Sequence, residues 1–268
     1  MYSKGASVTT HLGAGLLRIV LERPDEGNAL DDSTVEALRQ AFEKAGRDRE
    51  VHIVLLTGRG PSFCVGSPLP CVRDLGFDDG NENQRSAQRL ASLFLEMDSL
   101  EKPIVGRVQG RALGDGAGLV AACDLAVAAT TAHFALSDVR MGLVPAVSAP
   151  YILRKIGPAR TRELVLTGRD FDGAEAASLG LVVRAVDPSL LDAAVERILR
   201  DLKECAPEAL ARSKAALREI EQQVRSREDQ ARWSAGLLAS AREGEEARSR
   251  IGAFLDGGRP TWTARDLA

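Results

Sequence analysis

Apolar residues along the chain alternate in some stretches and recur with helical period in others. Residues 6–12 and 16–21 read as two strands, and the glycines at 13 and 15 predict a turn between them. Residues 51–57 are almost continuously apolar and end at Gly58, which is typical of a buried strand. Because a helical pattern lies between the second strand and this one, we expect parallel pairing and an α/β layer.

That helix is expected to begin at Asp32 or Ser33, because Ser33 and Glu36 have the spacing of a capping box. Its apolar positions are Val35, Leu38, Phe42 and Ala45. A second amphipathic helix is predicted over residues 84–100. The remaining predicted elements are helices at 158–166, 172–179, 188–202 and 207–254, and a short strand at 180–185.

A glycine-rich run, residues 110–118, follows a predicted strand at 103–109 and leads into the apolar residues 119–123. A helix that is apolar on every side belongs in a core. Glycines at its start let a ligand approach backbone N–H groups that no turn of helix satisfies, and the helix dipole there favours an anion or a developing oxyanion. A close-packed turn without a ligand fits the same residues. Ser67 and Pro68 form a second helix opening of this kind.

Composition and charge exclude several classes of function. The chain has 268 residues, 44% apolar and 27% charged, as in an ordinary globular protein with a sizeable core. Its net charge of −3 gives no electrostatic footprint for nucleic acid, and no run of about 18 apolar residues predicts a membrane span. The first residues lack the apolar core of a signal peptide, and the four cysteines are irregularly spaced. We therefore expect a cytoplasmic protein with reduced thiols and no metal site.

Four motifs in register resemble those of the crotonase (enoyl-CoA hydratase/isomerase) superfamily. They are NAL (28–30), LTGRGPSFCVGS (56–67), VQGRALGDGAGL (108–119) and FALSDVRMGLVP (134–145). Each motif alone is weak, but their order and spacing hold from about residue 8 to 262. The resemblance implies an α/β fold, a crotonase-type spiral of ββα turns with a helical C-terminal region. We expect the spiral core with the acyl-CoA site at residues 1–187 and a helical trimerisation region at 188–268.

The resemblance also implies a site. The family binds acyl-CoA thioesters and holds the thioester oxygen with two backbone N–H groups, which fall on Ser67 and Asp115 here. Substrate contacts are expected at Asn28, Ala29, Val65, Gly66, Leu69, Gly114, Ser137 and Phe254. Coenzyme A is then part of the substrate, so no separate cofactor is implied. The family assembles as homotrimers or hexamers, in which the C-terminal helix, here with Phe254 and Trp262, commonly reaches a neighbouring subunit's CoA site.

The chain departs from the family at the acid–base positions. Hydratases resembling the best-known member carry two glutamates, whose positions fall on Gly118 and on Asp138, a carboxylate one carbon shorter. Pro68 and Asp115 replace the usual aspartate and second glycine. Residues 136–157 resemble the branch with methylglutaconyl-CoA hydratases and polyketide β-branching dehydratases. Members of that branch can carry glycine at the first position and work with one acidic residue.

We therefore expect a single-carboxylate site that hydrates a 2,3-enoyl-CoA, or dehydrates a 3-hydroxyacyl thioester on CoA or a carrier, through an oxyanion-stabilised enolate. Asp138 would be the general acid–base, and the acyl group would be branched. Arg140 and Arg154 could bind a second carboxylate of such a substrate, although exposed arginines are common. An isomerase or decarboxylase on the same fold, or a non-catalytic acyl-CoA-binding protein, stays open. A Rossmann oxidoreductase is disfavoured, because the glycine run lacks the GxGxxG spacing.

Asp115 has two interpretations. Residues 115 and 118 share one helix face, so the Asp115 carboxylate could replace the group missing at Gly118. Against this, a charge beside the thioester oxygen would oppose the enolate. Alternatively, Asp115 turns outward and is favoured at the helix start by the dipole.

Overall fold

The computed structural model describes residues 6–68, 80–223 and 225–257, so Leu69 and Trp262 lie outside the described residues. The strands are β1 (Val8–Gly13), β2 (Leu16–Leu21), β3 (Ile53–Gly58), β4 (Ile104–Val108), β5 (Arg111–Leu113), β6 (Leu125–Ala129), β7 (His133–Ala135), β8 (Asp170–Asp172) and β9 (Arg184–Val186). The α-helices are α1 (Asp32–Arg47), α3 (Asn81–Ser99), α4 (Asp115–Ala122), α5 (Ala149–Thr167), α6 (Gly173–Leu179), α7 (Leu191–Lys203), α8 (Pro207–Gln222), α9 (Arg227–Glu243) and α10 (Glu245–Leu255). Short 3₁₀ helices are η1 (Pro24–Glu26), η2 (Ser137–Met141) and η3 (Pro188–Leu190).

Two sheets organise the chain. The larger has the order β1-β2-β3-β4-β6-β9, in which β1 and β2 form the predicted hairpin and the other neighbours pair in parallel. The smaller has the order β5-β7-β8, with β5 and β7 parallel. The expected α/β layer is therefore confirmed. The three-residue strands of the smaller sheet were not expected, because they are too short to show a period of two.

Helix α1 shows how closely the apolar pattern specifies an element. Its buried face includes the predicted positions Val35, Leu38, Phe42 and Ala45. The predicted cap is wrong, however, because Asp31 rather than Ser33 accepts the hydrogen bond from the Thr34 amide. A carboxylate two residues earlier takes the capping position, and the Ser33 hydroxyl donates to it instead.

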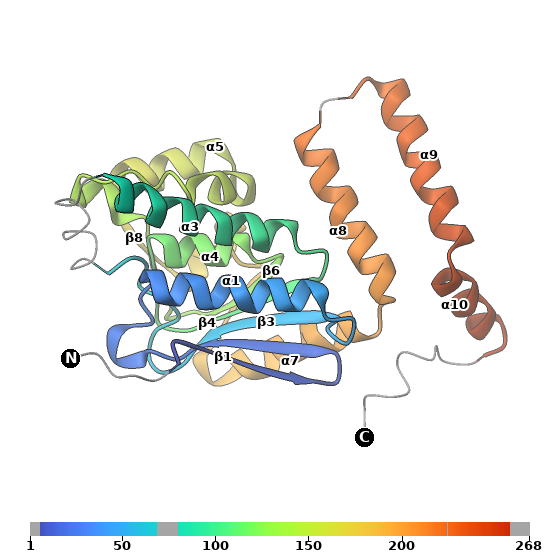
Figure 1. Cartoon of the computed structure of the whole chain (residues 1–268), viewed down its shortest axis with the longest axis horizontal. Coiled ribbons are helices and arrows are strands. Elements are labelled where there is room, and N and C mark those ends of the chain that lie inside the picture. The colour runs from blue at the N-terminus through green and yellow to red at the C-terminus, as the bar shows by residue number, and fades with distance from the viewer. Residues whose placement is uncertain (1–5, 69–79, 224, 258–268) are drawn as a thin grey trace.

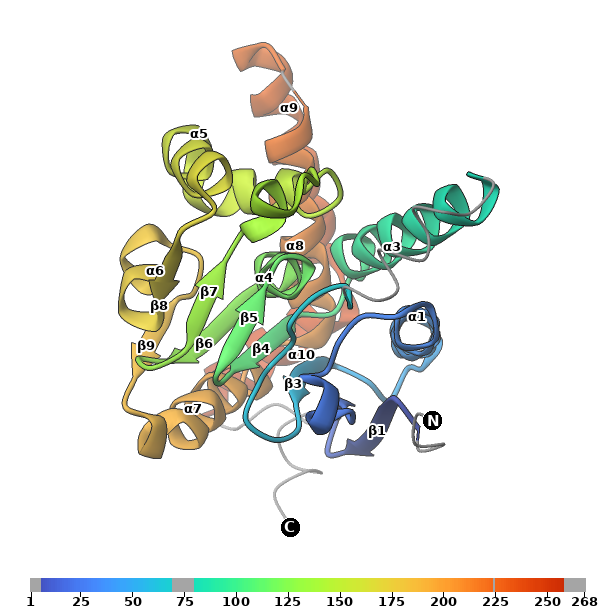
Figure 2. The ribbon, with the colours of Figure 1, turned by 90° about the vertical axis from the view of Figure 1, so that its left-hand side faces the viewer.

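The glycine-rich run forms β5, which was not expected, and the first turn of α4, where a helix start was predicted. Residues 116–121 of α4 are all buried, which agrees with a helix that is apolar on every side. In Figure 2, α4 lies near the centre, between α3 and α5. Glycine is required at position 114, where the backbone has a positive φ of 51° between strand and helix. The N-terminus of a core helix thus lies at the boundary between the two sheets.

After the motif at residues 134–145, the chain turns helical earlier than expected. Helix α5 begins at Ala149, whereas the pattern predicted a start at residue 158. Gly157, with φ of 74°, interrupts this helix just before Pro158, so its first half was not separable from a loop by pattern alone. Asp172 caps α6 as predicted, accepting a hydrogen bond from the Glu175 amide.

The C-terminal helices divide into two groups (Figure 1). Helix α7 packs on β4 and β6 and buries Leu191, Val195 and Leu199 in the core. Helices α8, α9 and α10 project from the core as an arm. The helical region expected from residue 188 thus includes one helix of the core, and the arm begins at α8. No helix in the described ranges is both long and apolar enough to cross a membrane.

Candidate functional site

A pocket of about 550 Å³ opens where the loop after β3, the start of α4 and η2 meet. Among the predicted site residues, Val65, Ser67, Gly114, Asp115, Ser137 and Asp138 line it. These residues come from three separate motifs, which the fold brings to one place. Phe254 lies on α10 with an exposed fraction of 76% and does not line this pocket.

The loop after β3 is held against β5 and α4 by backbone contacts. The Cys64 amide donates to the Arg111 carbonyl, and the Leu113 amide donates to the Cys64 carbonyl, each at 3.0 Å. At Gly66, where φ is 78°, a Cβ would lie 2.6 Å from the Leu113 carbonyl oxygen and 3.2 Å from the Asp115 amide nitrogen. Only glycine therefore lets this loop approach the first turn of α4 so closely.

Asn28 and Ala29 support the pocket from behind rather than lining it. The buried Asn28 side chain donates to the Ser62 carbonyl at 2.8 Å and accepts from the Arg23 amide at 2.9 Å. The Leu30 amide donates to the Gly66 carbonyl. These bonds fix the loop after β2 to the loop after β3, which shapes one wall of the pocket.

Two backbone amides at the pocket are free of intramolecular bonds. In the part of the chain that the structure describes, neither the Ser67 nor the Asp115 N–H donates a hydrogen bond. The Asp115 amide is at the first position of α4, where helical amides have no partner and the dipole is positive. Preorganised donors of this kind stabilise negative charge that develops on a ligand oxygen.

Asp115 faces the pocket, and the prediction that it turns outward is wrong. Its carboxylate accepts a hydrogen bond of 3.1 Å from the Ser67 hydroxyl, and it makes no capping bond to its own helix. Burial, followed by the charge of Asp138, raises the pKa of Asp115 to about 6. A carboxyl with that pKa carries a proton for part of the time near neutral pH.

Asp138 is the second carboxyl of the pocket. It lies in η2, and a Cβ built on Gly114 would come within 3.7 Å of its Oδ2. That oxygen is buried and has no hydrogen-bond partner among the described residues. Burial raises the pKa of Asp138. A buried carboxyl oxygen without a partner is suited to accept or donate a proton on a bound molecule.

The position of the missing family glutamate is filled by other side chains. A Cβ on Gly118 would lie 2.5 Å from the Ser148 Cβ and 2.9 Å from Cζ of Phe94. The Ser148 hydroxyl is fully buried and makes no hydrogen bond of good geometry, although it lies close enough to Asp115 to lower that group's pKa. Sequence reasoning missed Ser148 and Phe94, because no local pattern marks residues that reach a site only through the fold.

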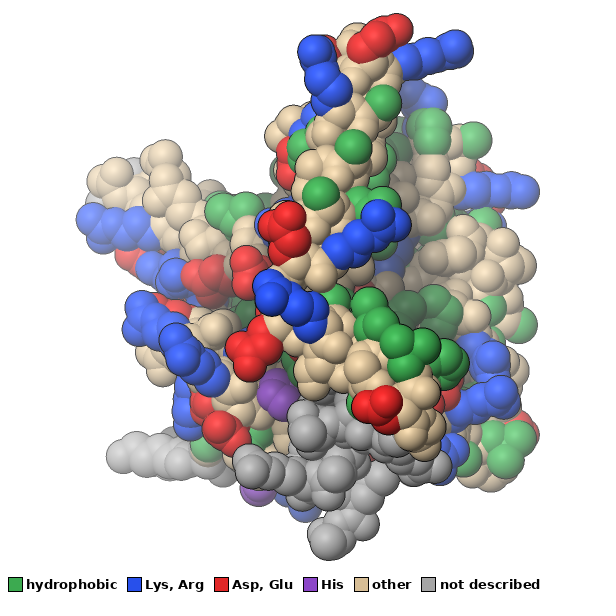
Figure 3. Space-filling view, turned by 90° about the vertical axis from the view of Figure 1, so that its right-hand side faces the viewer, with side chains coloured by type: hydrophobic (Ala, Val, Ile, Leu, Met, Phe, Trp, Pro, Cys, Tyr) green, Lys and Arg blue, Asp and Glu red, His purple; other side chains and the backbone are tan. Residues whose placement is uncertain are grey.

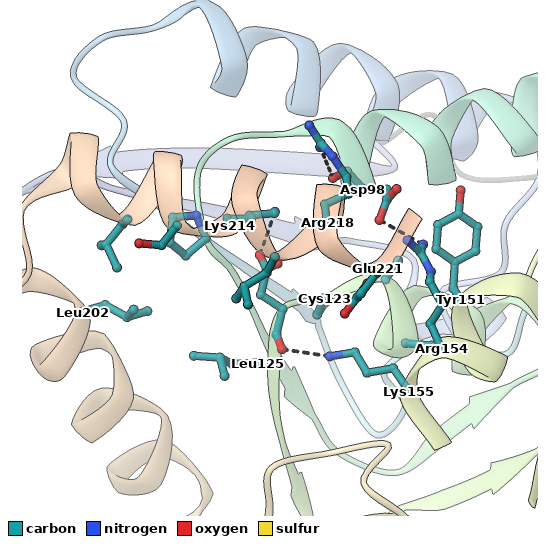
Figure 4. A pocket seen from close by; sticks show the side chains of 17 residues that line it. Asp98, Cys123, Leu125, Tyr151, Arg154, Lys155, Leu202, Lys214, Arg218 and Glu221 are labelled. Atoms are coloured by element: carbon teal, nitrogen blue, oxygen red, sulfur yellow. Dashed lines mark hydrogen bonds and ion pairs between the residues drawn. The ribbon is translucent and has the colours of Figure 1, made fainter. Parts of the chain in front are cut away.

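The two candidate arginines lie away from this pocket. The Arg140 side chain contacts Gly168 and its guanidinium donates to the Thr167 carbonyl. Arg154 pairs with Asp98 at 2.9 Å and stacks over Tyr151 in a second pocket, of about 410 Å³, between α8 and the core (Figure 4). The structure therefore favours their interpretation as ordinary structural arginines.

Arg111 is the arginine that does line the first pocket, and sequence reasoning missed it. It lies two residues before Leu113 on β5, so both side chains point to the pocket face of the strand. It has no ion pair or hydrogen bond from its side chain within the described ranges. Its place in the glycine-rich motif was the available signal.

Comparison with known proteins agrees with this geometry. Residues 11–265 match the family model described as enoyl-CoA hydratase/isomerase. Enoyl-CoA hydratase AKT6-1 of Alternaria alternata is 35% identical over 81% of this chain and 71% of its own length. Mevalonyl-coenzyme A hydratase sidH of Aspergillus fumigatus is 30% identical over 94% of this chain and 93% of its own. The solved structure of AtuE from Pseudomonas aeruginosa has a TM-score of 0.91 and 32% identity, covering 96% of this chain and 99% of that one.

Proposed function

Because the chain belongs to the enoyl-CoA hydratase/isomerase family, we propose that it adds water across the 2,3 double bond of an enoyl-CoA, or dehydrates a 3-hydroxyacyl thioester in reverse. The resemblance seen in the sequence is confirmed at the level of the family and its fold. The narrower branch stays a prediction.

One observation carries the proposal: the free amides of Ser67 and Asp115 and the unpartnered Asp138 oxygen share one pocket. In hydration, the two amides would hold the thioester oxygen as it takes up charge, and losing one donor typically costs about 10²–10³ in rate. Asp138 would take a proton from the attacking water, and in dehydration it would protonate the departing 3-hydroxyl.

We further propose that the acyl group is branched. We also propose that the substrate presents an anion to the pocket, either on the acyl group or on coenzyme A. The related sidH is named for a mevalonyl thioester, whose acyl chain is branched. Arg111 offers a cation on the pocket wall that no described residue pairs with, suited to a carboxylate of the acyl group or to a phosphate of coenzyme A. The carrier can be CoA or a protein-bound pantetheine, because both present the same thioester to the pocket.

A panel of thioesters tests the reaction. Enoyl-CoA and 3-hydroxyacyl-CoA substrates, straight or branched and with or without a terminal carboxylate, are incubated with the protein and analysed by mass spectrometry. We expect gain or loss of one water on a branched member. A product of unchanged mass would indicate an isomerase, and loss of carbon dioxide a decarboxylase. Tight CoA binding with no product from any substrate would support a non-catalytic acyl-CoA-binding protein.

The arm is expected to bind further copies of the chain. Apolar side chains are visible along α9 and α10 on the face shown in Figure 3. The large exposed ones are Leu217, Ile220, Leu238, Ile251, Phe254 and Leu255. A monomer rarely leaves so many apolar residues together in water. We predict a homotrimer or hexamer in which Phe254 lies near a neighbour's ligand. Sedimentation velocity at micromolar concentration checks this, and a stable monomer would refute it.

A further inference from the structure

Three carboxyl side chains among the described residues line the pocket, Glu26, Asp115 and Asp138, whereas the sequence predicted one acid–base carboxylate. Asp115 and Asp138 both line it, and the charge of Asp138 contributes to the raised pKa of Asp115. The space beside residue 118, where the family's first glutamate would stand, is closed by Ser148 and Phe94. A second acid–base group in this pocket therefore has to come from another position.

We propose that Asp115 is this group, and that it transfers the proton at C2 of the thioester while Asp138 acts on the water at C3. The inference rests on the proposed hydration. Asp115 is placed for it, because its own amide is one of the two donors to the thioester oxygen and C2 is bonded to the same carbonyl carbon. The Ser67 hydroxyl holds the carboxylate at 3.1 Å.

The proton inventory balances over one turnover. Asp138 takes a proton from water, the water oxygen bonds to C3, and the electron pair of the double bond moves toward the thioester carbonyl to give the enolate. Asp115 then donates its proton to C2, and the enolate pair becomes the new C–H bond. The proton on Asp138 returns to Asp115 directly or through solvent, which restores the starting state. Dehydration follows the same steps in reverse.

The environment of Asp115 keeps its carboxyl group from repelling the enolate. An ionised carboxylate beside the thioester oxygen would oppose the enolate, but a protonated one would not. Burial and the Asp138 charge both favour the protonated form of Asp115. Cys64, behind the loop, stays a neutral thiol because burial raises its pKa to about 12. Among the described residues, the remaining charged groups of the pocket walls are Glu26 and Arg111, of opposite sign.

Asp115→Asn tests the assignment. We expect its kcat to fall at least about 100-fold, since general acid–base groups contribute 10²–10⁴-fold, with KM within a few-fold. The variant should be no less stable than the wild type, because asparagine removes the cost of ionising a buried carboxyl and can still accept from Ser67. Asp172→Asn is the matched control. It makes the same change at the start of α6, outside the pocket, and should keep wild-type turnover.

The pH profile separates a catalytic from a structural role. Hydration needs Asp115 protonated, so kcat/KM of the wild type should fall as pH rises through the pKa of Asp115, about 6. The Asp115→Asn variant should lose that descending limb. Asp115→Gly, which restores the usual family residue, should also lose turnover at least about 100-fold.

The outcomes distinguish this inference from the proposed function. If the wild type hydrates a thioester and Asp115→Asn keeps more than a tenth of its turnover with the same pH profile, Asp115 is structural and the inference is overturned. If the wild type adds water to no member of the panel, the proposed function fails and the inference falls with it. A loss of turnover shared by Asp172→Asn would also overturn the assignment, because the effect would not be specific to the pocket.

Discussion

Asp138→Asn is expected to lower turnover of the true substrate by about 10²–10⁴-fold while thioester binding stays within a few-fold. The substitution keeps the shape of the side chain but removes its ability to take a proton. Among the described residues, Asp138 Oδ2 is buried and has no hydrogen-bond partner, so no other interaction competes for the proton it takes. The two free amides would still hold the thioester oxygen, which is why binding should survive.

Asp170→Asn is the matched control for that loss. Asp170 is exposed on β8, next to the strand that leads into η2, and it does not line the pocket. Its substitution should leave turnover unchanged. Near wild-type turnover in Asp138→Asn would show that the assigned role is wrong. No turnover in either the wild type or the variant, with CoA binding intact, would favour the non-catalytic interpretation.

Gly118→Glu is expected to destabilise the protein by about 3 kcal/mol or more and not to raise its turnover above that of the wild type. Family resemblance alone would suggest the opposite, because glutamate is the usual residue there. The structure shows that a side chain at 118 meets the Ser148 Cβ at 2.5 Å and the Phe94 ring at 2.9 Å. Overpacking of a closed core costs about 1–3 kcal/mol, and an unpaired buried carboxylate adds to it.

Graded variants isolate the packing part of this effect. Gly118→Ala should cost about 1–3 kcal/mol in urea unfolding at fixed protein concentration, and adding Ser148→Gly should recover part of it. Gly236→Ala is the control, because Gly236 is inside helix α9 and a Cβ there meets nothing within 4 Å. That variant should gain up to about 1 kcal/mol. If Gly118→Ala were as stable as the wild type, the closed space at 118 would be refuted.

Elements in which apolar residues repeat regularly over a long stretch of sequence were predictable. Helix α1 and the strands β1 to β4 were expected within a few residues of where they lie. Buried positions repeat over several turns of α1 and along β2 to β4, and the glycines at 13 and 15 mark the turn that ends β1. The smaller sheet was not, since each of its strands has three residues. The α1 cap at Asp31 was missed because several neighbouring residues can cap, and the competition is decided by backbone geometry.

The site was predictable only where a motif names a residue. The motifs named Ser67, Gly114 and Asp138, and all three line one pocket, while their roles stay predictions. The orientation of Asp115 was not, because it depends on a hydroxyl 48 residues earlier in the chain. The filled space at Gly118 depends in the same way on distant side chains. Contacts of this length leave no periodic signal in a sequence, so the sequence alone left the two interpretations of Asp115 open.

Running the reaction in water labelled with heavy oxygen tests whether this pocket adds water to an enoyl thioester. The geometry predicts one labelled oxygen at C3 of the product and an unlabelled thioester carbonyl, with labelled product formed about 10²–10⁴-fold more slowly by Asp138→Asn. Label in a free acid released with CoA would instead reveal thioester hydrolysis. That result, or an unlabelled isomer of the substrate, would contradict the proposed function.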